Sequence, residues 1–92
     1  MEENDFVLKE VGTSLHIYLG FELSMANSTA LREMLNNYRG QDINRIVFDA
    51  SDLVFLSSSG IRTILFAKQE VGQEPEIVFL NCAKEIYETF RI

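Results

Sequence analysis

Cysteine, histidine and proline each occur once in this sequence, and tryptophan is absent. A single cysteine excludes an internal disulfide, and it is too few for a zinc site, which usually takes four ligands from Cys, His and acidic residues. We interpret Cys82 as a small buried apolar side chain at the end of a strand. We therefore expect neither a metal site nor a cofactor.

Positive charge is also scarce, because 8 Lys and Arg residues face 14 Asp and Glu residues, for a net charge of -6. Nucleic acids and anionic lipid surfaces require clustered Lys and Arg side chains. The composition thus argues against both, and it favours protein partners with neutral or basic faces.

Long apolar runs are missing, and nothing approaches the roughly 20 consecutive apolar residues of a membrane span. The opening residues 1–5 are acidic and lack the basic and apolar regions of a signal peptide. We expect a cytoplasmic protein without membrane insertion. With 92 residues and 47% hydrophobic content, residues 1–92 should form one domain around one small core.

The first part of the chain has the patterns of two strands and a helix. Residues 6–11 are typical of an edge strand and lead through Gly12 and Thr13 into an alternating segment, which predicts an antiparallel pair. On one side of the second strand we expect Leu15, Ile17, Leu19 and Phe21, and on the other His16, Tyr18 and Gly20. His16 is therefore interpreted as an exposed strand residue.

Residues 24–39 have the period of an amphipathic helix capped by Ser24 or Asn27 and stopped at Gly40. Its predicted apolar face consists of Ala26, Ala30, Leu31, Met34, Leu35 and Tyr38.

The rest of the chain is organised around residues 46–68, where an apolar strand pattern leads through acids and three serines into a second helix. Ile61, Ile64 and Leu65 form its predicted buried stripe. Residues 77–80 are an apolar run typical of a strand buried on both faces, and residues 83–90 predict a short helix bearing Ile86, Tyr87 and Phe90.

Strands that alternate with helices imply right-handed crossovers and parallel pairing after the first hairpin. We predict an α/β fold, in which a mixed sheet of about four strands has helices packed mainly on one face. Leu19, Phe48, Leu65 and Phe79 are the predicted core.

The run D-L-V-F-L-S-S-S-G-I at residues 52–61 resembles the D-L-x-x-[MI]-D-S-S-G-[LI] signature of STAS domains, above all of stand-alone anti-sigma factor antagonists. E-L-S at residues 22–24 is similar to the G-E-L-D that precedes the first helix of that family. The resemblance runs from the first strand to about Asn81. This chain has Ser57 and Ser24 where the family commonly has Asp, and it is short at its C-terminus.

The resemblance implies a phosphorylation site at Ser59, directly before Gly60, with Ser58 as the alternate acceptor. A helix N-terminus favours an anion, so a phosphate would be tolerated there. It would add about -1.5 to -2 charges and block docking by repulsion and desolvation. The alternative interpretation is that the three serines only cap the helix. The implied partner-binding residues are Glu22, Ser24, Ser57, Ser58, Gly60, Arg62 and Phe66.

Arg62, Phe66 and Gln69 should face outward if the predicted stripe of the second helix faces the sheet. An exposed Phe beside an Arg is typical of a protein-binding surface. It favours either a partner surface specific to this chain or self-association as a homodimer.

No catalytic constellation is present, since the sequence lacks both a G-x-S-x-G elbow and a phosphate loop with its Lys. We therefore expect no enzymatic activity. Asp49 and Asp52 have two interpretations: Asp49 ends a strand and Asp52 organises the turn after it, or they belong to a site at the carboxyl end of the sheet.

Two functions remain open. In the first, the unphosphorylated protein binds an anti-sigma factor that is a serine kinase and frees a sigma factor, and phosphorylation at Ser59 blocks binding. In the second, the chain is a constitutive STAS-type subunit, as in lipid-transport ATPase complexes, without phosphorylation. Because resembling proteins continue with a further strand and helix, we expect these elements to be dispensable, or a partner or second copy to cover the surface they leave.

Overall fold

The computed structural model describes residues 6–72 and 74–90, in which a four-stranded sheet has the order β1-β2-β4-β6. Its strands are β1 (Val7–Val11), β2 (Ser14–Tyr18), β4 (Arg45–Asp49) and β6 (Glu76–Leu80). β1 pairs antiparallel with β2, whereas β2 with β4 and β4 with β6 pair in parallel. The mixed sheet predicted from the sequence is confirmed.

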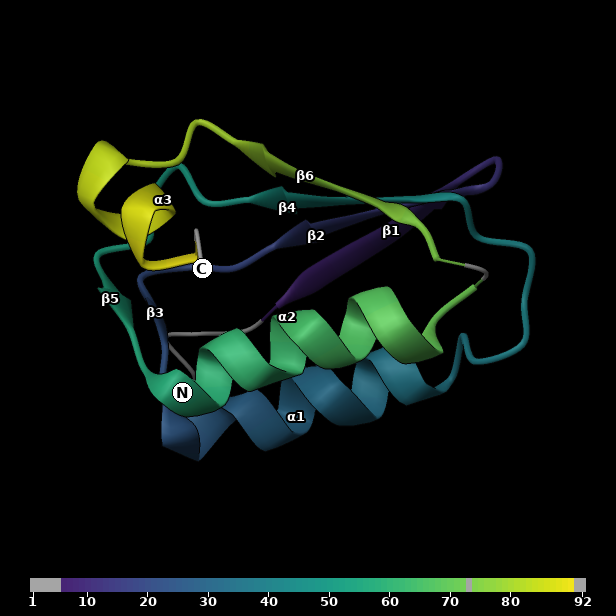
Figure 1. Ribbon diagram of the computed structural model, residues 1–92, viewed down its shortest axis with the longest axis horizontal. Coiled ribbons are helices and arrows are strands. Elements are labelled where there is room, and N and C mark those ends of the chain that lie inside the picture. The colour runs from purple at the N-terminus through teal and green to yellow at the C-terminus, as the bar shows by residue number, and fades with distance from the viewer. Residues whose placement is uncertain (1–5, 73, 91–92) are drawn as a thin grey trace.

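The two long helices, α1 (Met25–Asn36) and α2 (Ser58–Glu70), lie side by side on one face of the sheet (Figure 1). They run in the same direction because each follows a strand in a crossover to the next parallel strand. The short α3 (Lys84–Phe90) lies at the end of the sheet (Figure 1). On the opposite face of the sheet His16 is exposed, as its place in the alternating pattern predicts.

A second ladder pairs β3 (Glu22–Leu23) with β5 (Phe55–Leu56) in parallel. The Ser57 N–H also donates to the Leu23 carbonyl at 2.9 Å. This ladder immediately precedes both helices, so it holds the start of α1 beside the start of α2. Sequence reasoning did not anticipate it, because two-residue strands have too little pattern to detect.

The core lies between the sheet and the two long helices. Leu19 and Phe48 are fully buried there, and Phe79 packs against the same cluster with its ring 5.8 Å from that of Phe48. Cys82 and Ile86 also pack against it, half-buried. The side chain of Phe90, which we expected at this helix, lies outside the described residues.

The prediction for Leu65 was wrong, since 45% of this side chain is exposed. The inward face of α2 is formed by Gly60, Thr63, Ile64 and Ala67. It is turned toward α1 as well as toward the sheet, and Thr63 is tolerated inside because its hydroxyl donates to the Ser59 carbonyl at 3.0 Å. The buried stripe is therefore displaced around the helix from the one that the apolar residues suggested.

Three other expectations were also wrong. Phe21 is 55% exposed, because the chain leaves β2 after Tyr18 and Gly20 adopts a φ of 80°, which ends the alternation. β6 is half-buried or exposed along its length, since it is the outermost strand of the described sheet. In α1 Ala26 and Ala30 are exposed, and Ser28 takes the buried place with its hydroxyl donating to the Ser24 carbonyl.

Candidate functional site

The serine segment has one cap and two helical residues. The Ser57 Oγ accepts a hydrogen bond from the Gly60 N–H at 3.0 Å and is the N-cap of α2, while Ser58 and Ser59 are the first two residues of the helix. The cap that the sequence left ambiguous is therefore Ser57. Capping does not require the hydroxyls of Ser58 and Ser59, which leaves them available for another role.

Ser59 is half-buried at the edge of a hollow between α1 and α2, which it lines together with Arg32 and Arg62. Its Oγ accepts a long hydrogen bond of 3.5 Å from the Arg62 guanidinium. Ser58 is exposed and is not part of this lining. Of the two candidate acceptors, Ser59 is the one that lies beside cationic side chains.

Glu22 and Ser24 lie at the same end of the molecule as the serines, because the β3–β5 ladder holds the start of α1 beside the start of α2. Ser24 caps α1 in a reciprocal box, in which its N–H donates to the Asn27 Oδ1 at 2.7 Å and its Oγ accepts from the Asn27 N–H at 3.4 Å. Glu22 is half-buried and stands opposite Phe55 in the ladder. The structure thus brings the predicted residues Glu22, Ser24, Ser57, Ser58, Ser59 and Gly60 to the paired starts of the two helices.

Gly60 lies where α2 rests on β3. A Cβ at this position would stand 2.8 Å from the Leu23 Cγ and 2.9 Å from the Leu23 carbonyl oxygen. Real Cβ atoms do not approach a backbone oxygen so closely, so a larger residue would push α2 away from β3. The glycine of the motif is thus explained by packing.

We expect Gly60→Ala to lower the free energy of unfolding by about 1 to 2 kcal/mol, since the clash with Leu23 outweighs the better helix propensity of Ala. Urea denaturation measures this change. Ser58→Ala is the matched control, because Ser58 is exposed in the same first turn of α2, and this variant should stay within about 0.5 kcal/mol of the wild type. A Gly60→Ala protein as stable as this control would show that the contact of α2 with β3 is not tight.

Ser57→Ala should lower the free energy of unfolding by about 1 kcal/mol, because the Gly60 N–H loses its acceptor. In a domain of this size the midpoint of thermal unfolding should fall by about 4 to 8 °C. Ser59→Ala removes no cap and should have a smaller effect. Equal losses in the two variants would contradict the assignment of Ser57 as the cap.

Arg62 and Phe66 differ in their placement. Arg62 is exposed, as predicted, but Phe66 is half-buried and packs against the core cluster. The guanidinium of Arg32 stacks over the Phe66 ring at 4.3 Å from its centroid. The outward Phe66 expected from the sequence is therefore corrected: α1 lies beside this face of α2 and covers the ring.

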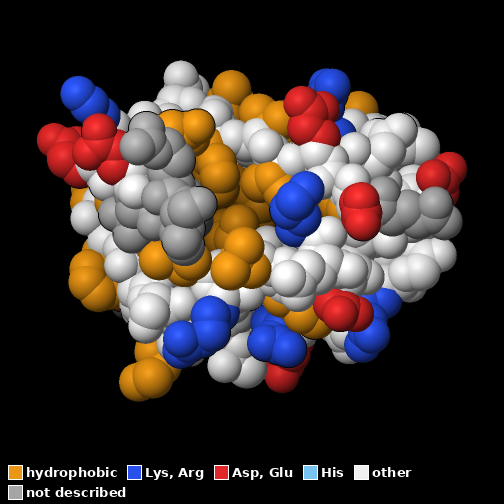
Figure 2. Space-filling model, viewed as in Figure 1, with side chains coloured by type: hydrophobic (Ala, Val, Ile, Leu, Met, Phe, Trp, Pro, Cys, Tyr) orange, Lys and Arg blue, Asp and Glu red, His pale blue; other side chains and the backbone are white. Residues whose placement is uncertain are grey.

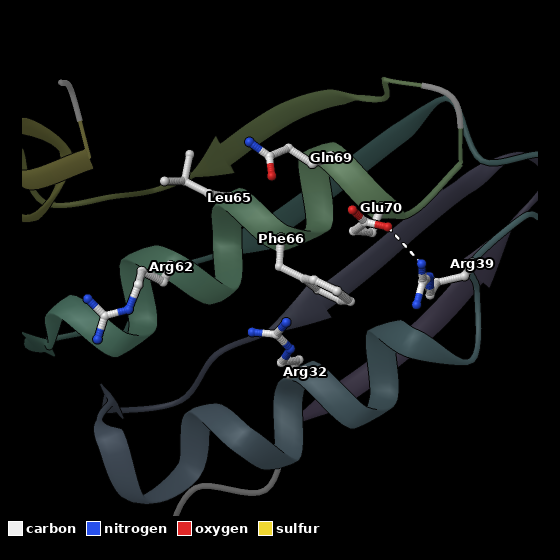
Figure 3. Close-up of a pocket in the computed structure, with 7 residues that line it drawn as sticks. All are labelled: Arg32, Arg39, Arg62, Leu65, Phe66, Gln69 and Glu70. Atoms are coloured by element: carbon white, nitrogen blue, oxygen red, sulfur yellow. Dashed lines mark hydrogen bonds and ion pairs between the residues drawn. The ribbon is translucent and has the colours of Figure 1, made fainter.

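These residues line a groove of about 490 Å³ between α1 and α2, in which Figure 3 shows Arg32 directed toward Phe66 and Arg39 directed toward Glu70. We call this the arginine groove and define it by Arg32, Arg39, Arg62, Phe66 and Glu70. Sequence reasoning found Arg62 and Phe66, and it missed Arg32, which lies on α1, and Arg39, which lies in the segment after α1.

The two acids at the end of β4 and in the turn after it have structural partners. The Asp49 carboxylate accepts from the Ser51 N–H at 3.1 Å and so shapes the turn, and Asp52 accepts from the Tyr18 hydroxyl at 2.5 Å. This hydrogen bond raises the pKa of Tyr18 above its ordinary value. Burial likewise raises the pKa of the Cys82 thiol. Over residues 6–72 and 74–90, no group of three or more His, Cys or acidic residues is placed to hold a metal ion.

None of the helices in the described part of the chain is both long and apolar enough to cross a membrane. The molecule is thus a small α/β domain whose distinctive surface is formed by the starts of two parallel helices and the groove between them.

The STAS domain family model matches residues 5–92, so the chain belongs to the STAS domain family. A search of curated proteins gives no significant match.

Three solved structures are similar in fold. The unphosphorylated anti-sigma factor antagonist SpoIIAA has a TM-score of 0.77 at 22% identity, with 95% of this chain and 82% of that chain covered. An anti-sigma factor antagonist from Mycobacterium paratuberculosis has a TM-score of 0.67 at 17% identity, covering 82% and 64%. The murine anion transporter Slc26a9 in its inward-facing state has a TM-score of 0.61 at 18% identity, covering 90% of this chain and 14% of the transporter.

Proposed function

We propose that this protein is an anti-sigma factor antagonist: unphosphorylated, it binds an anti-sigma factor with serine kinase activity and frees a sigma factor, and phosphorylation of Ser59 blocks that binding. The observation that carries the proposal is the position of Ser59. It is a helical residue released from capping by Ser57, and it opens onto a groove beside Arg62. Membership in the STAS family and the likeness in fold to two proteins with this role support it.

The site suits a binding protein better than an enzyme. The single histidine, His16, lies on the face of the sheet opposite to the helices and so is remote from Ser59. A serine nucleophile needs a base within hydrogen-bonding reach. The Ser59 Oγ instead accepts from Arg62, and an arginine does not deprotonate in proteins. We propose a cytoplasmic regulator that hydrolyses neither nucleotides nor esters.

The contacting surface in this proposal is the end of the molecule where the two helices start, with Glu22, Ser24, Ser57, Ser58 and Gly60 around Ser59. Exposed apolar side chains surround it: Phe21, Met25, Val54 and Phe55 are each at least half exposed. Apolar side chains around a central polar site are typical of a protein interface.

The test combines the purified chain with the histidine-kinase-like ATPase encoded nearest to its gene. Isothermal titration should show that the two proteins form a complex. After incubation with ATP, mass spectrometry should locate a phosphate on Ser59. Phosphate on Ser58 alone would move the acceptor by one residue.

Two observations would instead favour the constitutive subunit: transporter genes beside the gene of this protein, and a chain that stays bound to its partner without being phosphorylated. The occurrence of the same fold within a membrane transporter makes this the second candidate.

A further inference from the structure

The arginine groove concentrates positive charge in an acidic protein. It holds three of the eight Lys and Arg residues of a chain whose net charge is -6. Arg39 is paired with Glu70 at 2.9 Å, whereas neither Arg32 nor Arg62 forms a salt bridge with any residue of the described ranges. Figure 2 shows Lys and Arg side chains gathered over the two helices on this face. The groove thus holds two exposed cationic side chains, Arg32 and Arg62, beside a Glu70 that is paired with Arg39.

The groove adjoins the hollow at Ser59. That hollow has about 180 Å³ and shares both Arg32 and Arg62 with the larger part. Along α2 the combined lining extends from Ser59 to Glu70. At 1.5 Å per residue this is about 16 Å, the length of about five residues of extended peptide. The dimensions fit a short segment of polypeptide.

We propose that the arginine groove binds an acidic segment of the partner protein, and that phosphate on Ser59 competes for the same arginines. This inference rests on the proposed function, because it specifies the chemistry by which the partner docks. Guanidinium groups bind carboxylates with two parallel hydrogen bonds. Arg32 is held for this by its stacking over Phe66, which occupies the face of the guanidinium and leaves the N–H groups at its edge to a ligand.

The competition follows from the place of Ser59. Arg62 already donates to the Ser59 Oγ at 3.5 Å, and Arg32 lines the same hollow. A phosphate bonded to that oxygen would form charge-assisted hydrogen bonds with Arg62, and its negative charge would repel the carboxylates of the partner. Phosphorylation would thus neutralise the groove and close it to the acidic segment in one step.

The first experiment measures binding of the full chain to the kinase-like ATPase with Arg32→Glu, Arg62→Glu and the milder Arg62→Gln. Each charge reversal should weaken binding about tenfold or more, and binding by the wild type should fall as salt rises. Lys9→Glu is the matched control, because Lys9 is exposed on β1, outside the groove, and its reversal changes the net charge equally. Its affinity should stay close to that of the wild type.

If the wild type binds and the arginine variants bind as tightly as Lys9→Glu, the groove is not the docking site, although the proposed function survives. If the wild type does not bind, the proposed function fails. A second experiment, which does not need the partner, then tests whether the groove binds an acidic peptide. Thermal unfolding of every variant checks that the fold is retained.

The second experiment titrates the ¹⁵N-labelled protein with a hexaglutamate peptide and follows the amide shifts by NMR. Shifts should concentrate at Arg32, Arg62, Phe66 and their neighbours, and they should vanish in the Arg32→Gln/Arg62→Gln double variant. A hexalysine peptide should leave these amides unchanged. No shift with hexaglutamate, or the same shifts in the double variant, would overturn the proposal.

Discussion

The Ser59→Asp variant should lose most of its affinity for the partner and keep its stability. A carboxylate at Ser59 places a negative charge at the end of the arginine groove, where it pairs with Arg62 and repels an acidic ligand. Like charges brought together in an interface cost several kcal/mol, and because about 2.8 kcal/mol is a hundredfold change, we expect affinity to fall by at least about a hundredfold. Isothermal titration with the kinase-like ATPase measures this loss.

Stability should be nearly unchanged because Ser59 is not the cap. Ser57 keeps its hydrogen bond with Gly60, and an Asp in the first turn of α2, which has no acidic residue there, favourably meets the positive end of the helix dipole. Ser58→Asp is the control with the same charge at an exposed position outside the groove, and it should bind more tightly than Ser59→Asp. Equal affinity of Ser59→Asp and the wild type would exclude the switch and favour the constitutive subunit.

Gly72→Ala should produce the largest loss of stability among the single substitutions considered. Gly72 has a φ of 65°, and a Cβ added to it would lie 2.1 Å from the Ile43 carbonyl oxygen. The left-handed conformation alone costs a non-glycine residue about 1 to 2 kcal/mol, and the overlap requires the backbone around the buried Ile43 to move. We expect the free energy of unfolding to fall by about 3 kcal/mol in total, which lowers the midpoint of thermal unfolding by about 12 to 24 °C.

Gly12→Ala separates the two causes. Gly12 has a similar φ of 59°, but a Cβ there would meet no atom within 4 Å. The Gly12→Ala variant should therefore lose only the conformational part of the stability, about 1 to 2 kcal/mol of the free energy of unfolding. If calorimetry gave both variants the same midpoint, the contact of Gly72 with Ile43 would have no energetic weight.

The class of the fold could be predicted because its signals are local. Alternation of apolar residues marked β2, the apolar run marked β4, and helical spacing marked α1 and α2. The stripe on α2 could not be placed from its own residues. Leu65 is as apolar as Ile64, and only the position of α1 decides that Thr63 and Ala67 face inward and Leu65 does not.

The candidate site was predicted only in part, because its two helix starts have local motifs but the contact between them does not. The motif around Gly60 identified one helix start, and E-L-S identified the other. The ladder of β3 with β5, which places them side by side, consists of backbone hydrogen bonds that carry no side-chain pattern.

The net charge of the sequence also did not predict how charged side chains are arranged on the surface. The value of -6 favours a neutral or basic partner surface, yet the structure brings Arg32 and Arg62 from two helices into one groove. In physiological salt, interactions between exposed charges are screened beyond about 8 Å, so the local arrangement of charges outweighs the net charge.

The sequence by itself determined which segments become strands and helices, the family to which the chain belongs and the serines that open α2, because each depends on residues near one another in the chain. The tertiary structure alone decided which serine is the cap, which face of α2 is buried, and that arginines of two helices share one groove beside Ser59. The buried face of α2 and the shared groove depend on contacts between segments about 30 residues apart, which form when the two helices pack against one sheet. Ser57 is fixed at the start of α2 by the hydrogen bond of its N–H to the Leu23 carbonyl, which no local pattern encodes.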